Sequence, residues 1–352
     1  MPLSTINNTK PLPFAVSLGE PAGIGPETIL KAWMDRADHN LPDFFVVGSE
    51  RVLAETARKL GLEIPLQPLS SLEDVGAAFP DALPVLDLGL TDEFTFGTPS
   101  TATAALTIGA IEKSVELIFE GKAAGLVTAP IQKSVLYEAG FSCPGHTEYL
   151  AELCQKQASA PHTPVLMPVM MLVSDHLRVV PLTIHMAITD VVKAITPELI
   201  RRTSEIINTA LIQDFGLDHP RIAVAGLNPH AGEDGAMGTE EQRIITPALD
   251  LLRAQGMNIR GPLPADTLFH EAARATYDAA LCMYHDQALI PIKTLDFDGG
   301  VNVTIGLPII RTSPDHGTAL DIAGKNLASA NSMINALKQA QKIYTNRTRK
   351  NV

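Results

Sequence analysis

Cysteine, aromatic side chains and positive charge are all scarce in this chain of 352 residues. The three cysteines include no CxxC pair, so zinc-finger spacing is absent and the reduced thiols of a cytoplasmic protein are expected. Aromatic residues make up 5%, which argues against a platform that stacks single-stranded nucleic acid. A net charge of −12 repels phosphate backbones, and we therefore expect no nucleic-acid partner.

Long apolar runs are also missing. No stretch of about 18 apolar residues occurs, which is the length that a membrane-spanning helix requires. The first residues have no apolar segment after Lys10 of the kind that a secretory signal needs. We therefore expect neither a membrane span nor a signal peptide, and we expect a cytoplasmic location.

Three common catalytic and nucleotide-binding motifs are absent as well. The chain has no GxxxxGK[ST] loop and no GxSxG elbow, which disfavours a P-loop kinase and an α/β hydrolase. Gly23-x-Gly25 begins like a dinucleotide fingerprint, but Thr28 stands where the third glycine belongs. The match to the usual Rossmann motif is therefore weak.

What the chain does contain is a regular alternation of short apolar runs with helix-length segments. This pattern predicts βαβ units and an α/β fold whose mostly parallel sheet is covered on both faces. The length favours two domains. The expected strands are 14–18, 44–47, 85–88, 125–128, 169–173, 179–184, 222–225 and 280–283, and the expected helices are 26–35, 51–60, 102–120, 197–215, 239–255 and 327–344.

Histidines end three of these strands, at His185, His230 and His285. In α/β sheets, reactive groups lie where strands end, so three imidazoles can meet around one divalent ion if the strands share a sheet. Imidazole suits zinc, cobalt, nickel and iron. The competing interpretation is a cluster of neutral histidines that binds a phosphate or carboxylate through hydrogen bonds.

Five further residues are candidates for binding an anion. His146 and Thr147 follow a Pro-Gly turn at an expected helix N-terminus, where they can either donate to a substrate or cap the helix. Lys293 ends the segment YHDQALIPIK, while Asn302 and Arg311 flank VTIGLPII. A cation at such a strand end can clamp phosphate or carboxylate, and a surface ion pair explains either cation equally well.

Taken together, the segments GEPAGIGPE, TAPIQK, GHTE, GLNPHAGEDG, GPLPADTLF, MYHDQALIPIK and VNVTIGLPIIRTSPDHGTALDIAGK closely resemble the 4-hydroxythreonine-4-phosphate dehydrogenases of the vitamin B6 pathway. The resemblance runs from about Val16 to Lys325. Residues 316–324, HGTALDIAG, also look like the cofactor loop of isocitrate and isopropylmalate dehydrogenases, which share this family's fold. These enzymes bind NAD or NADP without a Rossmann glycine loop.

The resemblance implies two α/β/α domains of the isocitrate and isopropylmalate dehydrogenase type. Residues 1–140 with 305–352 would contribute to cofactor binding, and residues 141–304 would carry the metal ligands and the interface of a homodimer. The implied metal, zinc, cobalt or magnesium, is bound by His185, His230 and His285, the last contributed by the partner chain. The implied substrate contacts are His146, Thr147, Lys293, Asn302 and Arg311, and the implied cofactor loop includes His316, Gly317, Thr318 and Asp321.

The implied reaction is the NAD(P)-dependent oxidation of 4-phosphooxy-L-threonine to 2-amino-3-oxo-4-phosphooxybutanoate, which loses carbon dioxide to give 3-amino-2-oxopropyl phosphate. The base stays open between a metal hydroxide, His146 and Asp286. Residues 294–301, TLDFDGGV, are more acidic than is usual in the family. A first alternative is therefore a related metal-dependent dehydrogenase that acts on another phosphorylated four-carbon hydroxy acid or on a diol. The others are a phosphate acyltransferase of related fold, which lacks the three histidines, and a non-enzymatic metabolite-binding protein.

Overall fold

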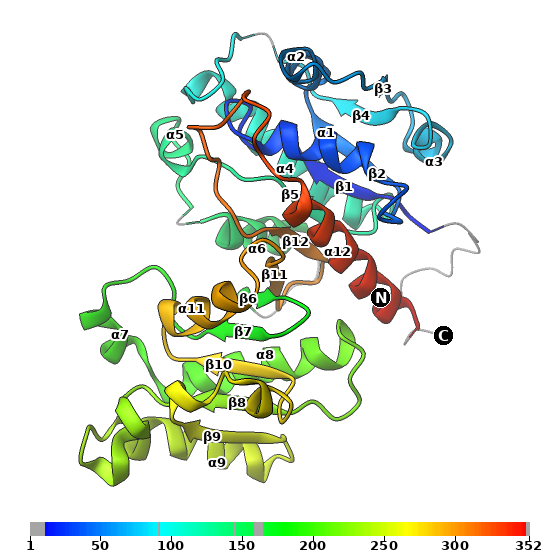
Figure 1. The fold of residues 1–352 in the computed structure, drawn as a ribbon. Helices are drawn as coiled ribbons and strands as arrows, with labels where there is room; N and C mark the ends of the chain where they lie inside the picture. The colour runs from blue at the N-terminus through cyan, green and yellow to red at the C-terminus, as the bar shows by residue number, and fades with distance from the viewer. Residues whose placement is uncertain (1–10, 91, 144, 158–164, 350–352) are drawn as a thin grey trace. The chain divides into compact units, whose positions relative to one another are not determined.

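The computed structural model describes residues 11–90, 92–143, 145–157 and 165–349. Its chain divides into two compact units. The first comprises Met1–Cys143, Lys156–Ser159 and His316–Ala340, and the second comprises Pro144–Gln155, Ala160–Asp315 and Gln341–Val352. Each unit contains a β-sheet with helices packed against it (Figure 1).

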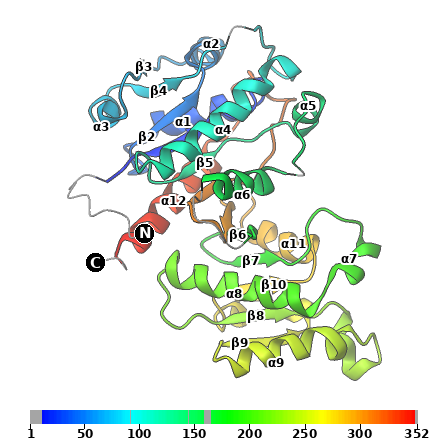
Figure 2. The ribbon, with the colours of Figure 1, turned by 180° about the vertical axis from the view of Figure 1, so that it is seen from behind.

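The first unit is built on parallel strands in the order β3-β4-β2-β1-β5. Helices α1 and α4 cover opposite faces of this sheet, as the two opposed views show (Figures 1 and 2). The strands are β1 (Phe14–Ser17), β2 (Phe44–Gly48), β3 (Leu66–Pro68), β4 (Leu83–Asp87) and β5 (Leu126–Thr128). The helices are α1 (Gly25–Met34), α2 (Glu50–Leu60), α3 (Val75–Ala78), α4 (Ala104–Phe119), α5 (Lys133–Glu138) and the first part of α12 (Asn331–Arg349).

Local sequence explains where these elements begin and end. Strands β1 and β2 are buried along their whole length, which suits apolar runs in a parallel sheet covered on both faces. The side chain of Ser49 caps α2 by accepting a hydrogen bond from the N–H of Val52 at 3.4 Å. Gly61 ends α2 in the left-handed conformation, with φ of 68°, which glycine adopts without steric cost.

The second unit contains strands in the order β12-β11-β6-β7-β10-β8-β9. Strands β7, β10, β8 and β9 are parallel, whereas β12, β11, β6 and β7 pair antiparallel. The strands are β6 (Val169–Val173), β7 (Arg178–Pro181), β8 (Ile222–Ala225), β9 (Ile259–Leu263), β10 (Ala279–Cys282), β11 (Val301–Ile305) and β12 (Arg311–Pro314). The helices are α6 (His146–Gln157), α7 (Ile188–Ala194), α8 (Pro197–Gln213), α9 (Thr246–Ala254), α10 (Glu271–Arg274) and α11 (His285–Leu295).

The α/β fold class expected from the sequence is confirmed, with two local corrections. The strand expected at 179–184 ends at Pro181, and the helix expected at 239–255 begins as a π-helical turn, Glu241–Ile245, that continues into α9. The second unit extends through β12 to Asp315, beyond the expected domain boundary after residue 304, because β12 pairs with β11 in one antiparallel ladder.

A buried apolar cluster supports the strand ends of the second unit. It joins β6, β7, β8 and β10 to one face of α11, with Ala288 and Ile292 as the helix contributions. This cluster therefore includes β7, β8 and β10, the three strands that the candidate histidines follow.

Among the helices that the structure describes, none combines the length and the hydropathy that crossing a lipid bilayer requires.

Candidate functional site

His185 and His285 lie side by side in the second unit. Their ring centroids are 5.6 Å apart, and the ring planes are tilted by 44°. The hydroxyl of Thr183 donates to the carbonyl oxygen of Met283 at 2.8 Å, which joins the segments that lead from β7 and β10 to the two histidines. Thr183 is buried, so this bond holds the two strand ends together from beneath.

The orientation of His285 is set by its neighbour. Nδ1 of His285 and Oδ1 of Asp286 are 2.7 Å apart, which leaves Nε2 of the imidazole available to a ligand. Two imidazoles bound to one zinc ion at about 2.0–2.1 Å place their ring centroids roughly 5–6 Å apart. The spacing of His185 and His285 therefore fits two ligands of one divalent ion.

His230 lies on a different part of the same unit, in the turn Pro229–Gly235 that follows β8. Its backbone is left-handed, with φ of 50°. Within the described part of the chain, no three His, Cys, Asp or Glu side chains form a group that could hold a metal ion. The structure therefore brings His185 and His285 together but does not bring His230 into the same cluster.

Arg311 is a buried cation at the start of β12. Its Nη1 donates to the hydroxyl of Thr304 at 2.9 Å, and its Nη2 lies 3.4 Å from Nδ1 of His146, the first residue of α6. Burial lowers the pKa of Arg311 to about 10, so the guanidinium is still charged at neutral pH. A desolvated cation beside an imidazole has the charge and the donors that an anion needs, so this geometry is compatible with the substrate contacts expected at Arg311 and His146.

Asn302 and Lys293 lie on neighbouring elements of the same unit. Asn302 is two residues before Thr304 on β11, so both side chains point to the same face of the sheet. Its buried Oδ1 has no hydrogen-bond partner among the described residues. Lys293, in the last turn of α11, forms an ion pair of 2.6 Å with Asp315, which directly follows β12. Four of the five expected substrate residues are thus tied to β11, β12 or the start of α6, and Thr147 follows His146 on α6.

The loop expected to bind the cofactor belongs to the first unit. Thr318 is buried, and its hydroxyl donates to Oε1 of Gln132 at 2.8 Å. Its carbonyl oxygen accepts from the N–H of Ile24 at 3.0 Å. A Cβ at Gly23 would lie 2.9 Å from that oxygen, so glycine is required for this close approach. These contacts join three of the sequence motifs, GEPAGIGPE, TAPIQK and HGTALDIAG.

The remaining residues of this loop are more accessible. Gly317 and Asp321 are exposed, and Nδ1 of His316 lies 3.0 Å from the carbonyl oxygen of Gly317. The exposed Gly317 leaves main-chain groups available to a nucleotide, and the exposed carboxylate of Asp321 offers an acceptor. The geometry is compatible with the expected cofactor role of His316, Gly317, Thr318 and Asp321.

Glu20 is a buried acid that the sequence interpretation did not single out. Its Oε1 accepts from the N–H of Ala22 at 3.1 Å and from the hydroxyl of Thr103 at 3.3 Å. Burial raises the pKa of Glu20 above its ordinary value. The only available signal was its place shortly after the strand expected at 14–18, because an acid is seldom buried and its residue type alone does not indicate burial.

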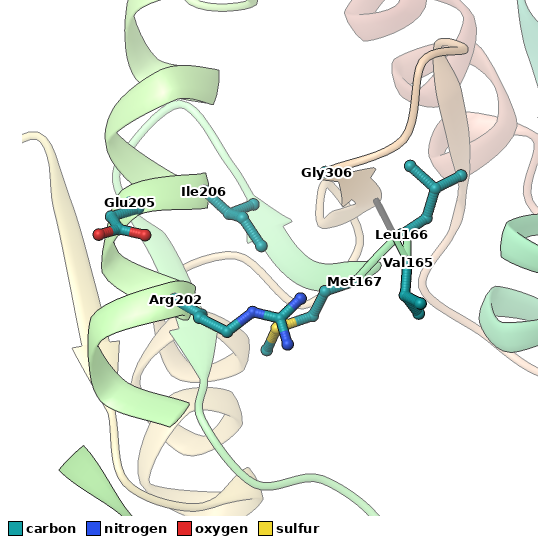
Figure 3. A pocket seen from close by; sticks show the side chains of 7 residues that line it. All are labelled: Val165, Leu166, Met167, Arg202, Glu205, Ile206 and Gly306. Carbon is teal, nitrogen blue, oxygen red and sulfur yellow. The ribbon is translucent and has the colours of Figure 1, made fainter. Parts of the chain in front are cut away.

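A hollow of about 270 Å³ opens elsewhere in the second unit, against α8 (Figure 3). It is lined by Val165, Leu166, Met167, Arg202, Glu205, Ile206 and Gly306. None of these residues is a candidate metal, substrate or cofactor ligand. This hollow is therefore separate from the residues that carry the expected chemistry.

Comparison with known proteins gives concordant matches over nearly the whole chain. The family described as pyridoxal phosphate biosynthetic protein PdxA matches residues 40–340. A 4-hydroxythreonine-4-phosphate dehydrogenase of Methylorubrum extorquens is 51% identical over 333 residues, which are 94% of this chain and 94% of that protein. One of Bradyrhizobium diazoefficiens is 51% identical over 344 residues, 96% of this chain and 98% of that protein. The crystal structure of a 4-hydroxythreonine-4-phosphate dehydrogenase from Klebsiella pneumoniae has a TM-score of 0.82 at 35% identity, covering 95% of this chain and 100% of that one.

Proposed function

This chain belongs to the pyridoxal phosphate biosynthetic protein PdxA family, and we propose that it is a 4-hydroxythreonine-4-phosphate dehydrogenase. The observation that carries the proposal is the pairing of His185 with His285 in the unit that also holds the buried Arg311. A pair of metal-binding imidazoles and an anion clamp are the parts that oxidation of a phosphorylated alcohol requires.

The proposed reaction removes a hydride and a proton from the secondary alcohol of 4-phosphooxy-L-threonine. The hydride passes to NAD or NADP and the proton passes to a base, which leaves 2-amino-3-oxo-4-phosphooxybutanoate. Loss of carbon dioxide from this 3-oxo acid gives 3-amino-2-oxopropyl phosphate. His185, His230 and His285 would hold a zinc, cobalt or magnesium ion, and such an ion would supply Lewis-acid stabilisation of negative charge on the substrate oxygen.

The anionic ends of the substrate would be held by Arg311, Lys293 and Asn302, with His146 and Thr147 beside them. Because the guanidinium of Arg311 donates to Nδ1 of His146, a neutral His146 carries its proton on Nε2. This tautomer donates a hydrogen bond to a phosphate or carboxylate oxygen. We therefore assign His146 to substrate binding.

We propose that Asp286 takes the alcohol proton. Its Oδ1 is engaged by His285, while its side chain is 71% exposed and has a second oxygen. A carboxylate in this position can both orient the imidazole and accept a proton from a substrate held next to it. The loop from His316 to Asp321 is the proposed binding site for NAD or NADP.

We further propose that the enzyme is a homodimer whose metal site is completed by the partner subunit. Two observations support this arrangement. Among the described residues of one chain, no three side chains form a group that could hold a metal ion. In addition, apolar side chains are exposed next to the histidine pair. Met186 and Ile188 follow His185, and Ile290 lies on the helix that His285 begins. Exposed apolar side chains next to an incomplete site are typical of a surface that another subunit covers.

The acidic segment 294–301 does not require a different substrate. Asp296 accepts a hydrogen bond from the N–H of Gly299 at 2.7 Å, so its carboxylate is used within the turn. The side chain of Lys293 packs over the ring of Phe297 at 5.4 Å. The acidic residue nearest to Lys293 in this segment thus has a structural explanation, which supports 4-phosphooxy-L-threonine over another four-carbon acid.

The direct test is the rate of nicotinamide reduction with 4-phosphooxy-L-threonine and, in parallel, with 4-phosphoerythronate. We expect reduction with the first substrate only. We also expect that a chelator abolishes it and that zinc or cobalt restores it. No reduced nicotinamide from 4-phosphooxy-L-threonine in the presence of metal would overturn the assignment, and full activity in chelator would overturn the metal site.

A further inference from the structure

Two buried polar side chains, Glu241 and Gln287, clamp the backbone that leads to His230 and His285. We propose that they are positioning residues for the metal site, an inference that rests on the metal-binding role proposed above. Neither side chain is accessible as a ligand itself, since Glu241 is 3% exposed and Gln287 is 9% exposed. Both must act through the backbone that they bind.

Gln287 links the end of β8 to the end of β10. Its Nε2 donates to the carbonyl oxygen of Gly226 at 2.8 Å, and its Oε1 accepts from the N–H of Met283 at 2.7 Å. Gly226 directly follows β8, and Met283 directly follows β10. One primary amide therefore sets the spacing between the two segments that lead to His230 and to His285.

Glu241 holds the next residues of the β8 loop. Its Oε1 accepts from the N–H of Leu227 at 2.8 Å and from the N–H of Asn228 at 2.7 Å. Its Oε2 accepts from Nδ2 of Asn228 at 2.9 Å. A carboxylate that receives three N–H groups in a buried site makes strong, directional bonds. The backbone just before Pro229 and His230 is thus fixed from both sides, by Gln287 and by Glu241.

The conformation of His230 explains why such a clamp is needed. Every residue from His230 to Asp234 has a positive φ, between 41° and 83°. Non-glycine residues are strained in this region and persist only where the surroundings hold them. At Gly232, a Cβ would lie 2.7 Å from Oε2 of Glu241, so this carboxylate packs against the strained turn itself. Glu241 also begins a π-helical turn, a feature that often accompanies functional sites.

The test measures zinc affinity of the metal-free full-length protein, by competition with a chelating dye. Gln287→Met keeps the size of the side chain and removes both hydrogen bonds, and Glu241→Gln removes at least one of the three. We expect each variant to bind zinc about 10–100-fold more weakly than the wild type, as is typical when groups that orient metal ligands are lost. Gln287→Met alone carries the test if Glu241→Gln does not fold.

Glu240→Gln is the matched control. Glu240 also accepts a hydrogen bond from Nδ2 of Asn228, at 2.8 Å, but its side chain binds neither main-chain amide that Glu241 holds. Its zinc affinity should match that of the wild type. Wild-type affinity in folded Gln287→Met, with only a lower melting temperature, would reduce Gln287 to a structural residue and overturn the inference. Absence of zinc binding in the wild type would instead overturn the proposed metal site, before any variant is compared.

Discussion

The imidazole rings of His185 and His285 lie 5.6 Å apart within one chain, although the two residues are far apart in the sequence. They meet because β7 and β10 are parallel neighbours, with Val179 opposite Ala280. His185 is exposed, so the pair lies at the surface of its unit. A two-fold axis near this surface would bring the partner subunit's His285 close to His185 as well.

A complementation experiment separates the ways in which two chains can share the metal site. If the partner contributes His285, hybrids of the His185→Ala and His285→Ala proteins contain one site with all three histidines. We expect these mixtures to recover activity, up to about half of the wild-type value per hybrid dimer, because one of its two sites is complete. Mixtures of His185→Ala with His230→Ala should stay inactive. One chain then supplies both His185 and His230 to each site, so every site in the hybrid dimer lacks one of these two histidines.

The opposite pattern would reassign the ligands. Activity from His185→Ala with His230→Ala, and none from His185→Ala with His285→Ala, would show that one chain supplies the close pair and that the partner supplies His230. The readout is nicotinamide reduction after the two purified variants have been incubated long enough for subunits to exchange.

Lys293 provides a test of substrate capture. An ion pair with Asp315 holds the ammonium of Lys293 at the end of β12. Lys293→Ala should therefore weaken binding of the phosphorylated substrate while the packing of the core stays unchanged. A hydrogen bond to a charged group contributes about 1.5–3 kcal/mol, which predicts a KM roughly 10–100-fold higher. Lys122→Ala, which removes an exposed ion pair with Glu120, is the control. An unchanged KM in Lys293→Ala would remove Lys293 from the substrate site.

Much of the fold could be predicted from the sequence because its information is local. The runs at 169–173 and 222–225 match β6 and β8 residue for residue. The antiparallel pairing of β6 with β7 was also available in principle, since residues 174–177 are too few for the crossover that parallel strands need. The π-helical start of α9 was not, because apolar periodicity predicts a helix without distinguishing a π-helical turn from an α-helical one.

The candidate site was only partly predictable, for a similar reason. Histidines at strand ends could be recognised, but which two would meet depends on the strand order β7-β10-β8. Gln287 and Glu241 carry no chemical signal as residue types, and their importance appears only through the main-chain groups that they bind. Residues that act through the backbone are therefore the part that needs a structure.

Glu20 gives a pH-dependent prediction. Because burial raises its folded pKa, the folded state holds the proton more tightly than the unfolded state, whose value is near 4.5. The favourable contribution is complete below pH 4.5 and is lost as the pH rises through the folded pKa. The side chain of Gln in Glu20→Gln cannot ionise. The melting temperature of this variant should therefore rise by a few degrees relative to that of the wild type between pH 4.5 and 7.

The control for this series is Glu120→Gln, since the hydrogen bond from Lys122 lowers the pKa of the exposed Glu120. The melting temperature of Glu120→Gln should not rise relative to that of the wild type between pH 4.5 and 7. Thermal unfolding measured at several pH values gives both comparisons. If the difference in melting temperature between Glu20→Gln and the wild type stayed constant with pH, burial would not raise the pKa of Glu20.

Thr318 tests the proposed cofactor loop independently of the metal. Thr318→Val keeps the branched shape but removes the hydroxyl that donates to Gln132, so the loop loses its tie to the segment after β5. We expect the KM for NAD or NADP to rise about 2–12-fold, since one buried hydrogen bond contributes about 0.5–1.5 kcal/mol. The KM for the phosphorylated substrate and the zinc affinity should not change, because their proposed ligands lie in the second unit.

Thr345→Val is the matched control, because the hydroxyl that it loses forms a hydrogen bond only within α12. Equal weakening of cofactor and substrate in Thr318→Val would point to a general loss of structure, whereas no effect on the cofactor would place NAD or NADP elsewhere on the first unit.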